Sequence, residues 1–498
     1  DPLPDSDADT LEGRLIAIWE QFFGRAGLQL GDNFYALGGD SLMAISLVSR
    51  INSAFQLQLQ VGDFLRTENI GALCSLLSAS SADTGGAIVT RAETRDDYPT
   101  SFEQQSILAA RNSIYPTRFN CSAAFEIERL VDPERLERAF RKLVARHEIL
   151  RTCFDRGACR QRVLRATPSH LPVISGDAEA AHIMDTFVQP FDPTEPPLMR
   201  AALVDAPSYP RLLLLDAHHS ITDAVSLNVM MRELWSLYNG DEIGPVRLHY
   251  GDYAVWQRRN TANGRVERDR RFWLDWMDGF VWTALPSGPG GTEPEHGQMS
   301  TTIDAGDREA LARFCERLAA TPMTVLLSSL ALVVARLTEQ IDITLGLRVS
   351  RRTSAALETM LGPFVEDAPC RLRIPGRPDT SELLRQVADG IARSLDHGFY
   401  PYDRLNDDLQ QREPTPNGEL FSILVNYVPA IQDMGASGRF RALPRPASSK
   451  YDLNLRLRDG ASLVLDAKYR SDKYSASFIS DFLTAIADQA SEICSAGG

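Results

Sequence analysis

A stretch over residues 78–97, rich in Ser, Ala, Thr, Gly and charged residues, divides this chain into two parts of different character. Such a composition is typical of a linker. Before it, apolar residues recur at helical spacing, and after it helical segments alternate with strand-like apolar runs. Since 498 residues also exceed one ordinary domain, we expect a multidomain protein with a tail over 1–10, an all-α bundle over 11–78, a linker over 79–97 and an α/β part beyond.

Local patterns predict individual elements in both parts. In the first part, two amphipathic helices are predicted from the apolar positions Leu11, Leu15, Ile18, Trp19 and Phe22, and then Leu42, Ile45, Val48 and Ile51. In the second part, helices are predicted over 133–144, 225–238, 307–319 and 324–337. Strands are predicted over 211–217, 341–349 and 463–469.

The composition argues against several classes of protein. A formal net charge of −14 repels the phosphates of a nucleic acid, so we expect no such partner. No apolar run reaches membrane-spanning length and no signal peptide opens the chain, so we expect no membrane association. The seven cysteines are scattered without a Cys-x-x-Cys pair, which favours reduced thiols in a cytoplasmic protein over disulfides or a metal site. Because the chain begins Asp-Pro, we expect it to be a piece of a larger polypeptide and a monomer as a fragment.

Ser41 is the first candidate functional residue. Gly38 and Gly39 permit a tight turn, and Asp40-Ser41 then opens a helix. A helix N-terminus stabilises a phosphate diester through its free N–H groups and its dipole, so a serine there is a suitable place for a phosphate-linked arm. The plain alternative is an N-cap serine. Esterase chemistry of the Gly-x-Ser-x-Gly type is excluded because Met43 stands where the second glycine is required.

His218 and His219 form the second candidate site. They end the apolar run over 211–217, which predicts a buried strand. Successive strand residues point to opposite faces, so the two imidazoles cannot easily share one metal ion. Asp223 follows four residues after His219. Packing of both histidines in the core is the plain alternative.

Several segments together resemble known families. The segment 32–42, Asp-Asn-Phe-Tyr-Ala-Leu-Gly-Gly-Asp-Ser-Leu, resembles the phosphopantetheine attachment site of a peptidyl carrier (thiolation) domain. His-His-Ser-Ile-Thr-Asp, 218–223, resembles the active-site motif of a nonribosomal peptide synthetase condensation domain. Further segments match that family's core motifs in order: 101–105 the first, 146–154 the second, 250–256 the fourth, 345–352 the fifth and 362–365 the sixth.

The resemblance implies a fold and a cofactor. The expected fold is a small all-α four-helix carrier bundle followed by an α/β condensation domain, built from two chloramphenicol-acetyltransferase-like lobes in a V. We place the N-lobe at 98–272 and the C-lobe at 273–498. The implied cofactor is 4'-phosphopantetheine attached to Ser41. No metal is implied.

The resemblance also implies an activity and partners. The chain would be an acyltransferase that forms a peptide bond when an acceptor amine attacks a carrier-bound donor thioester. His219 would take a proton or hold the amine, while Asp223 would support it, His218 would be structural and Arg352 would pair with Asp223. Expected partners are upstream adenylation and condensation domains, a downstream acceptor carrier or soluble acceptor, and a phosphopantetheinyl transferase, in the biosynthesis of an antibiotic, siderophore or similar secondary metabolite.

Departures from the motifs leave alternatives open. Ala224 replaces the usual glycine, Arg348 the usual proline, and Glu366-Asp367 the usual Asn-Thr. A terminal or ester-forming condensation domain, which releases the chain onto a hydroxyl or an amine or by cyclisation, is one alternative. A non-catalytic recruitment (docking) module is another.

Overall fold

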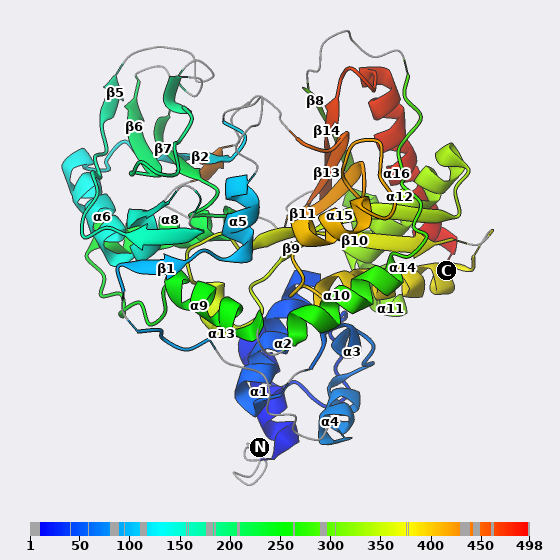
Figure 1. Ribbon diagram of the computed structural model, residues 1–498. Coiled ribbons are helices and arrows are strands. Elements are labelled where there is room, and N and C mark those ends of the chain that lie inside the picture. The colour runs from blue at the N-terminus through cyan, green and yellow to red at the C-terminus, as the bar shows by residue number, and fades with distance from the viewer. Residues whose placement is uncertain are drawn as a thin grey trace.

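The chain is seen in a computed structural model, which describes residues 10–39, 41–57, 59–79, 89–93, 95–109, 117–155, 157, 159–175, 183, 186–206, 210–261, 264–288, 296–303, 305–374, 376, 378–428, 439–441, 449–459 and 463–496. The predicted tail, except Thr10, and most of the predicted linker lie outside these residues, as does Asp40. Two lobes stand side by side, and a helical bundle lies beneath them (Figure 1).

The first part of the chain is an all-helical bundle. Its helices are α1 (Leu11–Phe23), α2 (Ser41–Phe55), α3 (Val61–Leu65) and α4 (Ile70–Ala79). Its core is one apolar cluster around Trp19, Phe34 and Phe64, whose rings lie 5.0–6.1 Å apart by their centroids. Thr10 caps α1 by accepting the Gly13 N–H, which explains where that helix begins.

The first lobe is built on a five-stranded sheet of order β12-β2-β7-β6-β5, in which β12 is Arg439–Arg441, with a three-stranded sheet of order β1-β4-β3 beside it. Helices α6 and α8 pack against each other (Figure 1). The elements are β1 (Asp97–Pro99), α5 (Phe102–Ala109), β2 (Asn120–Ile127), α6 (Pro133–Arg146), η1 (Glu148–Arg151), β3 (Thr152–Phe154), β4 (Arg160–Val163), β5 (Val173–Ser175), β6 (Met199–Asp205), β7 (Arg211–His218) and α8 (Ala224–Asn239).

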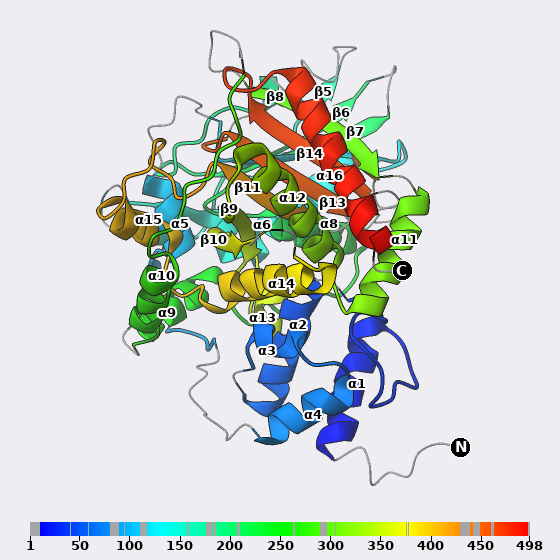
Figure 2. The ribbon, with the colours of Figure 1, turned by 90° about the vertical axis from the view of Figure 1, so that its right-hand side faces the viewer.

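The second lobe is built on a six-stranded sheet of order β10-β9-β11-β13-β14-β8. In Figure 2, α12 and α16 lie in front of this sheet and α14 runs across below them. Helices α9 (Tyr250–Thr261) and α10 (Arg265–Trp276) lead into this lobe. Its elements are β8 (His296–Ile303), α11 (Ala305–Leu318), α12 (Pro322–Thr338), β9 (Asp342–Ser350), α13 (Ala355–Glu358), β10 (Val365–Arg373), α14 (Thr380–Asp396), α15 (Tyr402–Gln410), β11 (Ile423–Val428), β13 (Leu453–Asp459), β14 (Leu463–Arg470) and α16 (Ala476–Ala496).

One strand crosses between the lobes. Strand β12 (Arg439–Arg441) comes from the second half of the chain but pairs antiparallel with β2 of the first lobe, with Phe440 opposite Phe125. The two lobes are therefore joined by backbone hydrogen bonding as well as by side chains. Within the described residues no single helix is long and apolar enough to cross a membrane; the consecutive helices Arg308–Leu318 and Pro322–Thr338, bent by 102°, reach that length and composition only together.

Candidate active site between the two lobes

Strand β7 ends at the two histidines, with His218 as its last residue and His219 directly after it. Its residues 212–218 are buried, and it pairs on one side with β2 and on the other with β6. His218, the last strand residue, is buried, and its Nδ1 lies 2.7 Å from Ser220 Oγ. His219 is half-buried, so part of its ring remains open to a substrate. The structure thus separates the neighbours into a packed and an accessible imidazole.

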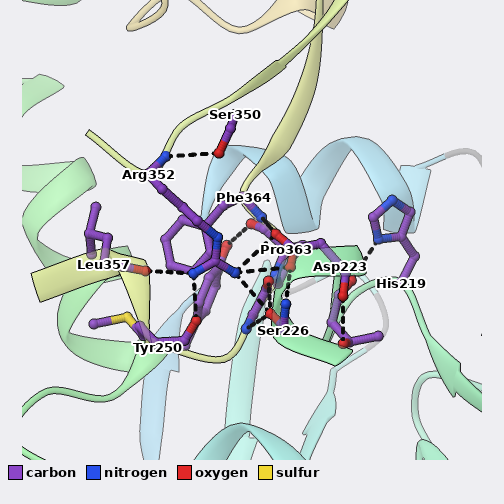
Figure 3. A network of polar contacts seen from close by, with 12 residues as sticks. His219, Asp223, Ser226, Tyr250, Ser350, Arg352, Leu357, Pro363 and Phe364 are labelled. Carbon is purple, nitrogen blue, oxygen red and sulfur yellow. Dashed lines mark hydrogen bonds and ion pairs between the residues drawn. The ribbon is translucent and has the colours of Figure 1, made fainter. Parts of the chain in front are cut away.

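The hydrogen bonds of His219 decide which ring nitrogen can act as a base. Its Nδ1 lies 2.7 Å from the carbonyl oxygen of Thr222 (Figure 3). A carbonyl only accepts, so Nδ1 carries the hydrogen and Nε2 of the neutral ring is the free acceptor. The loop is held in addition by Gln104, whose amide nitrogen donates to the Ser220 carbonyl at 3.2 Å. Gln104 belongs to the first sequence motif, but no local pattern connects it with the histidines.

The surroundings of His219 change its protonation. Burial disfavours the imidazolium, but the Cys121 sulfur and the Thr222 carbonyl outweigh it and raise the pKa of His219 to about 9. A raised pKa means that the ring holds a second proton at neutral pH and loses it as the pH rises through about 9.

We therefore expect a pH-dependent transfer rate if His219 must accept a proton. The rate under single-turnover conditions should increase from pH 7 to about 9, because the fraction of neutral imidazole increases over that range. The measurement is the rate of product formation at each pH, with an acceptor whose own amine titrates below pH 7 so that its ionisation does not contribute. A rate that is flat from pH 6 to 9 would contradict the expectation.

Asp223 does not touch the His219 ring but fixes the chain beside it. It is the N-cap of α8, where its Oδ1 accepts the Ser226 N–H at 2.7 Å. Its Oδ2 accepts the Phe364 N–H at 3.1 Å. Thr222 immediately precedes this cap. Its carbonyl, which accepts the hydrogen bond from His219 Nδ1, is therefore held in place by the same interactions. Asp223 thus acts on His219 through the backbone.

Arg352 completes this network from the second lobe. Its Nη2 lies 2.9 Å from Asp223 Oδ1, and both side chains are buried. The same nitrogen donates to Ser226 Oγ at 2.9 Å, and Nη1 donates to the Met360 carbonyl at 2.7 Å. The guanidinium also lies 4.2 Å from the centroid of the Phe364 ring. The sequence-predicted residues His219, Asp223 and Arg352 are therefore brought to one place, where the lobes meet (Figure 3).

Asp223→Asn is expected to lower the free energy of unfolding of this domain by about 3–5 kcal/mol, because it leaves the buried Arg352 charge without its partner. An asparagine can still cap α8, so the loss would report on the ion pair. Denaturant titration of the variant beside the parent measures this. Asp205→Asn is a control, since that carboxylate pairs with Arg211 while partly exposed, and should cost about 1 kcal/mol or less. Equal stability of the two variants would argue against a buried, mutually dependent pair.

Two of the departures from the family motifs, Arg348 and Asp367, are paired with each other. Arg348 on β9 stands directly opposite Asp367 on β10, and its Nε lies 2.9 Å from Asp367 Oδ1. Tyr451 donates its hydroxyl to Asp367 at 2.7 Å. Although burial raises the pKa of Asp367, Arg348 and its other neighbours hold it below the ordinary value. Replacement of a proline by Arg348 and of a threonine by Asp367 therefore produces one compensated ion pair.

Glu366, the remaining charged departure, is compensated in the same way. Its carboxylate lies 3.0 Å from Arg351 Nε and accepts the Tyr402 N–H at 2.8 Å. Burial raises the pKa of Glu366, and the Arg351 guanidinium opposes that rise. The departures thus add charge between the lobes without leaving these carboxylates unpaired.

The remaining motifs converge on the same place. Tyr250 of the fourth motif donates its hydroxyl to the Pro363 carbonyl of the sixth at 2.7 Å and lies 2.8 Å from Ser101 Oγ of the first. In the second motif, His147 Nε2 lies 2.6 Å from Glu233 of α8. Tyr250 therefore joins the first motif to the sixth, whereas His147 holds α8 within the first lobe.

The carrier loop fits a phosphate-linked arm. Gly38 adopts φ 84°, and Gly39 lies so close to Phe34 that a Cβ would come within 2.4 Å of its ring. Ser41 is the first residue of α2, a 15-residue helix. The first N–H groups of a helix have no partner within it and favour a phosphate.

The carrier bundle is docked on the second lobe through its helices α2 and α3. Arg50 Nη2 lies 3.0 Å from Glu358 Oε2 on α13, and Ser46 donates to the same carboxylate. At α3, the N–H groups of Val61 and Gly62 donate to the two oxygens of Asp396 at 2.9 and 3.2 Å. Asp396 thereby caps the N-terminus of a helix in the other domain. The Arg50 and Glu358 side chains are about one-third and one-quarter exposed, so this pair contributes little and suits a reversible contact.

A cavity of about 190 Å³ lies between the docked carrier and the lobes. The carrier contributes Ile45, Val48 and Asn52 to its wall. The larger domain contributes Glu103 and Arg351 among others. Helix α2, which begins at Ser41, therefore faces this cavity. The opposite wall includes Arg351, which precedes Arg352 in the chain.

Gly62→Ala is expected to displace α3 from α14 without unfolding the carrier. A Cβ at Gly62 would lie 2.9 Å from both Ala392 Cβ and Asp396 Oδ2, whereas alanine is intrinsically a better helix former than glycine. Hydrogen exchange of the intact chain should therefore speed up in a peptide covering 61–66. Gly71→Ala in α4 is the matched control, because its Cβ would meet nothing closer than 3.4 Å. Unchanged exchange in Gly62→Ala would mean that this contact does not hold the carrier in place.

Comparisons with known proteins agree with this geometry. A family model described as "Condensation domain" matches residues 94–496, and one described as "Phosphopantetheine attachment site" matches residues 13–77. Surfactin synthase subunit 1 of Bacillus subtilis (strain 168) is 28% identical over 490 residues, which is 95% of this chain and 14% of that protein. Tyrocidine synthase 2 of Brevibacillus parabrevis is 29% identical over 469 residues, 91% of this chain and 13% of that protein. The chain thus spans less than a fifth of the length of these relatives.

Solved structures share the fold. The X-domain from teicoplanin biosynthesis, in complex with OxyB, matches with a TM-score of 0.71 and 22% identity, over 82% of this chain and 96% of that chain. The first condensation domain of the calcium-dependent antibiotic synthetase, in complex with a substrate analogue, matches with a TM-score of 0.67 and 21% identity, over 81% of this chain and 97% of that chain. The expected fold, a helical carrier followed by a two-lobed condensation domain, is confirmed.

Proposed function

This chain belongs to the condensation-domain family and carries a phosphopantetheine attachment domain before it, and from that premise we propose that it transfers an acyl or peptidyl group from Ser41 to an acceptor amine in nonribosomal peptide synthesis. The observation that carries the proposal is the half-buried His219 between the lobes, with its Nδ1 bonded to the Thr222 carbonyl, so that Nε2 is the accepting nitrogen once the ring is neutral. The docked carrier supports it, because helix α2, which begins at Ser41, lines a cavity whose wall also includes Arg351, the neighbour of Arg352.

In this proposal the residues of the chain have separate roles. Phosphopantetheine on Ser41, when attached, supplies the thiol that holds the donor as an activated thioester. His219 takes up the proton that the acceptor amine loses as the amide forms, a role typically worth about 10²–10⁴-fold in rate. Asp223 and Arg352 hold the loop so that the imidazole is in place before the amine arrives. His218 packs the end of β7.

The place of the chain in a longer assembly follows from its relatives. Their names are those of synthases or synthase subunits, and each is much longer than this chain. We infer that upstream adenylation and condensation domains supply the donor and that a downstream carrier or a soluble acceptor receives it. A phosphopantetheinyl transferase is needed to prime Ser41. Release onto a hydroxyl or an amine, or by cyclisation, is the closest alternative within the same chemistry.

A second candidate function is recruitment of another protein. It is favoured by one specific observation, since the X-domain with this fold was solved in complex with OxyB. In that case the surface of the two lobes would bind an enzyme that acts on the carrier-bound chain, and His219 would not be needed.

One experiment separates these functions. The intact chain is loaded at Ser41 with an acyl group, and an amine, a hydroxyl compound and an aminoacyl carrier are each added in turn. Intact mass then reports loss of the acyl group from the chain and its arrival on the acceptor. Transfer to an amine or to the carrier supports the proposed function, and transfer to the hydroxyl compound alone supports the ester-forming alternative. A loaded chain that transfers to none of them contradicts both and favours recruitment.

A further inference from the structure

The segment that joins β9 to β10, residues 351–364, touches the docked carrier with a side chain of its short helix α13. That side chain is Glu358, whose Oε2 lies 3.0 Å from Arg50 Nη2 on α2 of the carrier. Ser46, one turn earlier on α2, donates its hydroxyl to Oε1 of the same carboxylate. Residues four apart on a helix share a face, so one face of α2 supplies both contacts.

The backbone on either side of Glu358 holds Arg352. Arg352 Nη1 donates to the Leu357 carbonyl, and it donates to the Met360 carbonyl at 2.7 Å. Leu357 immediately precedes Glu358, and Met360 follows two residues after it. The Leu357 and Met360 side chains are buried in the apolar cluster that forms the core of the first lobe. A shift of the backbone at Glu358 therefore acts on the Arg352 guanidinium with no other side chain between them.

Arg352 in turn holds the histidine loop (Figure 3). Its Nη2 lies 2.9 Å from Asp223 Oδ1. Asp223 caps α8, and the carbonyl of the residue before it is bonded to the His219 ring. The N–H of Phe364, at the end of the same segment, donates to Asp223 Oδ2 at 3.1 Å. Hydrogen bonds and short backbone steps thus run without a break from the carrier helix to the imidazole.

The other polar contacts of the carrier lead elsewhere. At α3, two backbone N–H groups bond to Asp396, and Arg66 Nη1 lies 3.2 Å from Asp389 Oδ1. Both carboxylates stand on α14. Within the part of the chain that the structure describes, neither of them is bonded to Arg352 or to the histidine loop. The contact at α13 is therefore the one that connects docking with the active site.

We propose that Glu358 is a positioning residue for the transfer reaction: the docked carrier holds Glu358, and α13 thereby holds Arg352 and the histidine loop in their working positions. The partner that Glu358 recognises is a carrier helix that presents a hydroxyl and a guanidinium four residues apart. This inference rests on the proposed transfer function. It assigns a role to a residue that lies outside every sequence motif.

The strength of the contact limits the size of the effect. The Arg50 and Glu358 side chains are about one-third and one-quarter exposed, and an ion pair of this kind is weak. A partner shifts an equilibrium only by the free energy of its own differential contacts. We therefore expect changes of about two- to fivefold, and not a loss of function, when the pair is broken.

Hydrogen exchange of the intact chain tests the coupling without any transfer. The reporter is a peptide covering 359–366, which contains the Phe364 N–H bonded to Asp223. In Arg50→Gln the substitution lies on the carrier, yet this peptide should exchange about two- to fivefold faster than in the parent, because local opening becomes easier. Arg66→Gln is the matched control, since it removes an exposed ion pair between the carrier and α14 and should leave the peptide unchanged.

A double-mutant cycle shows that the effect passes through Glu358. Glu358→Ala should speed exchange of the same peptide, and the double variant with Arg50→Gln should exchange no faster than the faster of the two single variants. Exchange at the parent rate in Arg50→Gln overturns the inference, as does equal acceleration in Arg66→Gln.

A kinetic measurement then tests the role in transfer. In single-turnover transfer from loaded Ser41 to an amine, Arg50→Gln should lower the rate at saturating amine by about two- to fivefold. The amine concentration that gives half of that rate should stay unchanged, and Arg66→Gln should change neither quantity. If exchange responds but the transfer rate of Arg50→Gln equals that of the parent, the positioning role is overturned while the proposed function stands. If exchange responds and the parent chain transfers nothing, the coupling is supported and the proposed function fails.

Discussion

Ser41→Ala is expected to fold normally, to take up no phosphopantetheine and to transfer nothing. The core of the carrier is built from other residues, with Trp19, Phe34 and Phe64 at its centre. Alanine is well tolerated at the first position of a helix, so α2 should remain. What is lost is the single hydroxyl that follows the glycine turn at the start of that helix. The expected effect is complete because there is then nothing to carry the donor.

The measurement is intact mass after treatment with coenzyme A and a broad-specificity phosphopantetheinyl transferase. The parent chain should gain one phosphopantetheine and the variant none. Ser46→Ala is the matched control, since Ser46 lies on the same helix but its hydroxyl is bound to Glu358. It should load like the parent. A Ser41→Ala chain that still gains the mass would overturn the assignment of the attachment site.

Elements determined by local sequence were predictable, and their positions agree closely. The helix predicted over 133–144 is α6 (Pro133–Arg146), and the strand predicted over 211–217 is β7 (Arg211–His218). Thr321 caps α12 by accepting the Thr324 N–H, as its place before a proline suggests. Such features depend on hydrophobic periodicity and on caps, which are contained in a few neighbouring residues.

Features that depend on distant pairing were not predictable. Nothing around 439–441 indicates that it adds a strand to the sheet of the other lobe. In the sequence Arg348 and Asp367 are two separate departures, and only the register of β9 and β10 shows that they form one ion pair. In the sequence nothing distinguishes Cys121 from the other six cysteines, because His219, its neighbour in the strand ladder, lies 98 residues away by their numbers. The pairing of Asp223 with Arg352 is expected from the family resemblance, since spacing alone does not place them together.

His219→Ala is expected to reduce transfer by about 10²–10⁴-fold while loading at Ser41 stays normal, because in the proposed reaction the ring takes up the proton that the amine loses. The rate is measured in a single turnover from the loaded chain to an amine acceptor. The ring is only half-buried, so its removal should cost less stability than removal of a buried side chain. A variant that keeps the parent rate would show that proton uptake by His219 does not limit the reaction.

His218→Asn is the matched control for this variant. His218 is buried and its Nδ1 is bonded to Ser220, so its replacement should lower stability by about 1–3 kcal/mol, the cost of leaving a buried polar group unpaired. Its transfer rate, measured well below the unfolding temperature, should stay close to the transfer rate of the parent chain. A loss of rate as large as that of His219→Ala would mean that the packing of the strand end, and not the accessible ring, controls transfer.

Comparison of His219→Gln with His219→Ala then separates the two roles of the ring. The glutamine amide oxygen can hold an amine by a hydrogen bond, but it cannot take up the proton at neutral pH. If His219 acts mainly by holding the amine, glutamine should restore much of the rate, because alignment of reactants alone is worth many powers of ten. If His219 must accept the proton, glutamine should be as slow as alanine, and the slope of the rate with pH between 7 and about 9 should vanish in both variants. We expect the second outcome, because Thr222 holds the hydrogen of the neutral ring on Nδ1, so that Nε2 becomes a basic nitrogen as the pH rises through about 9.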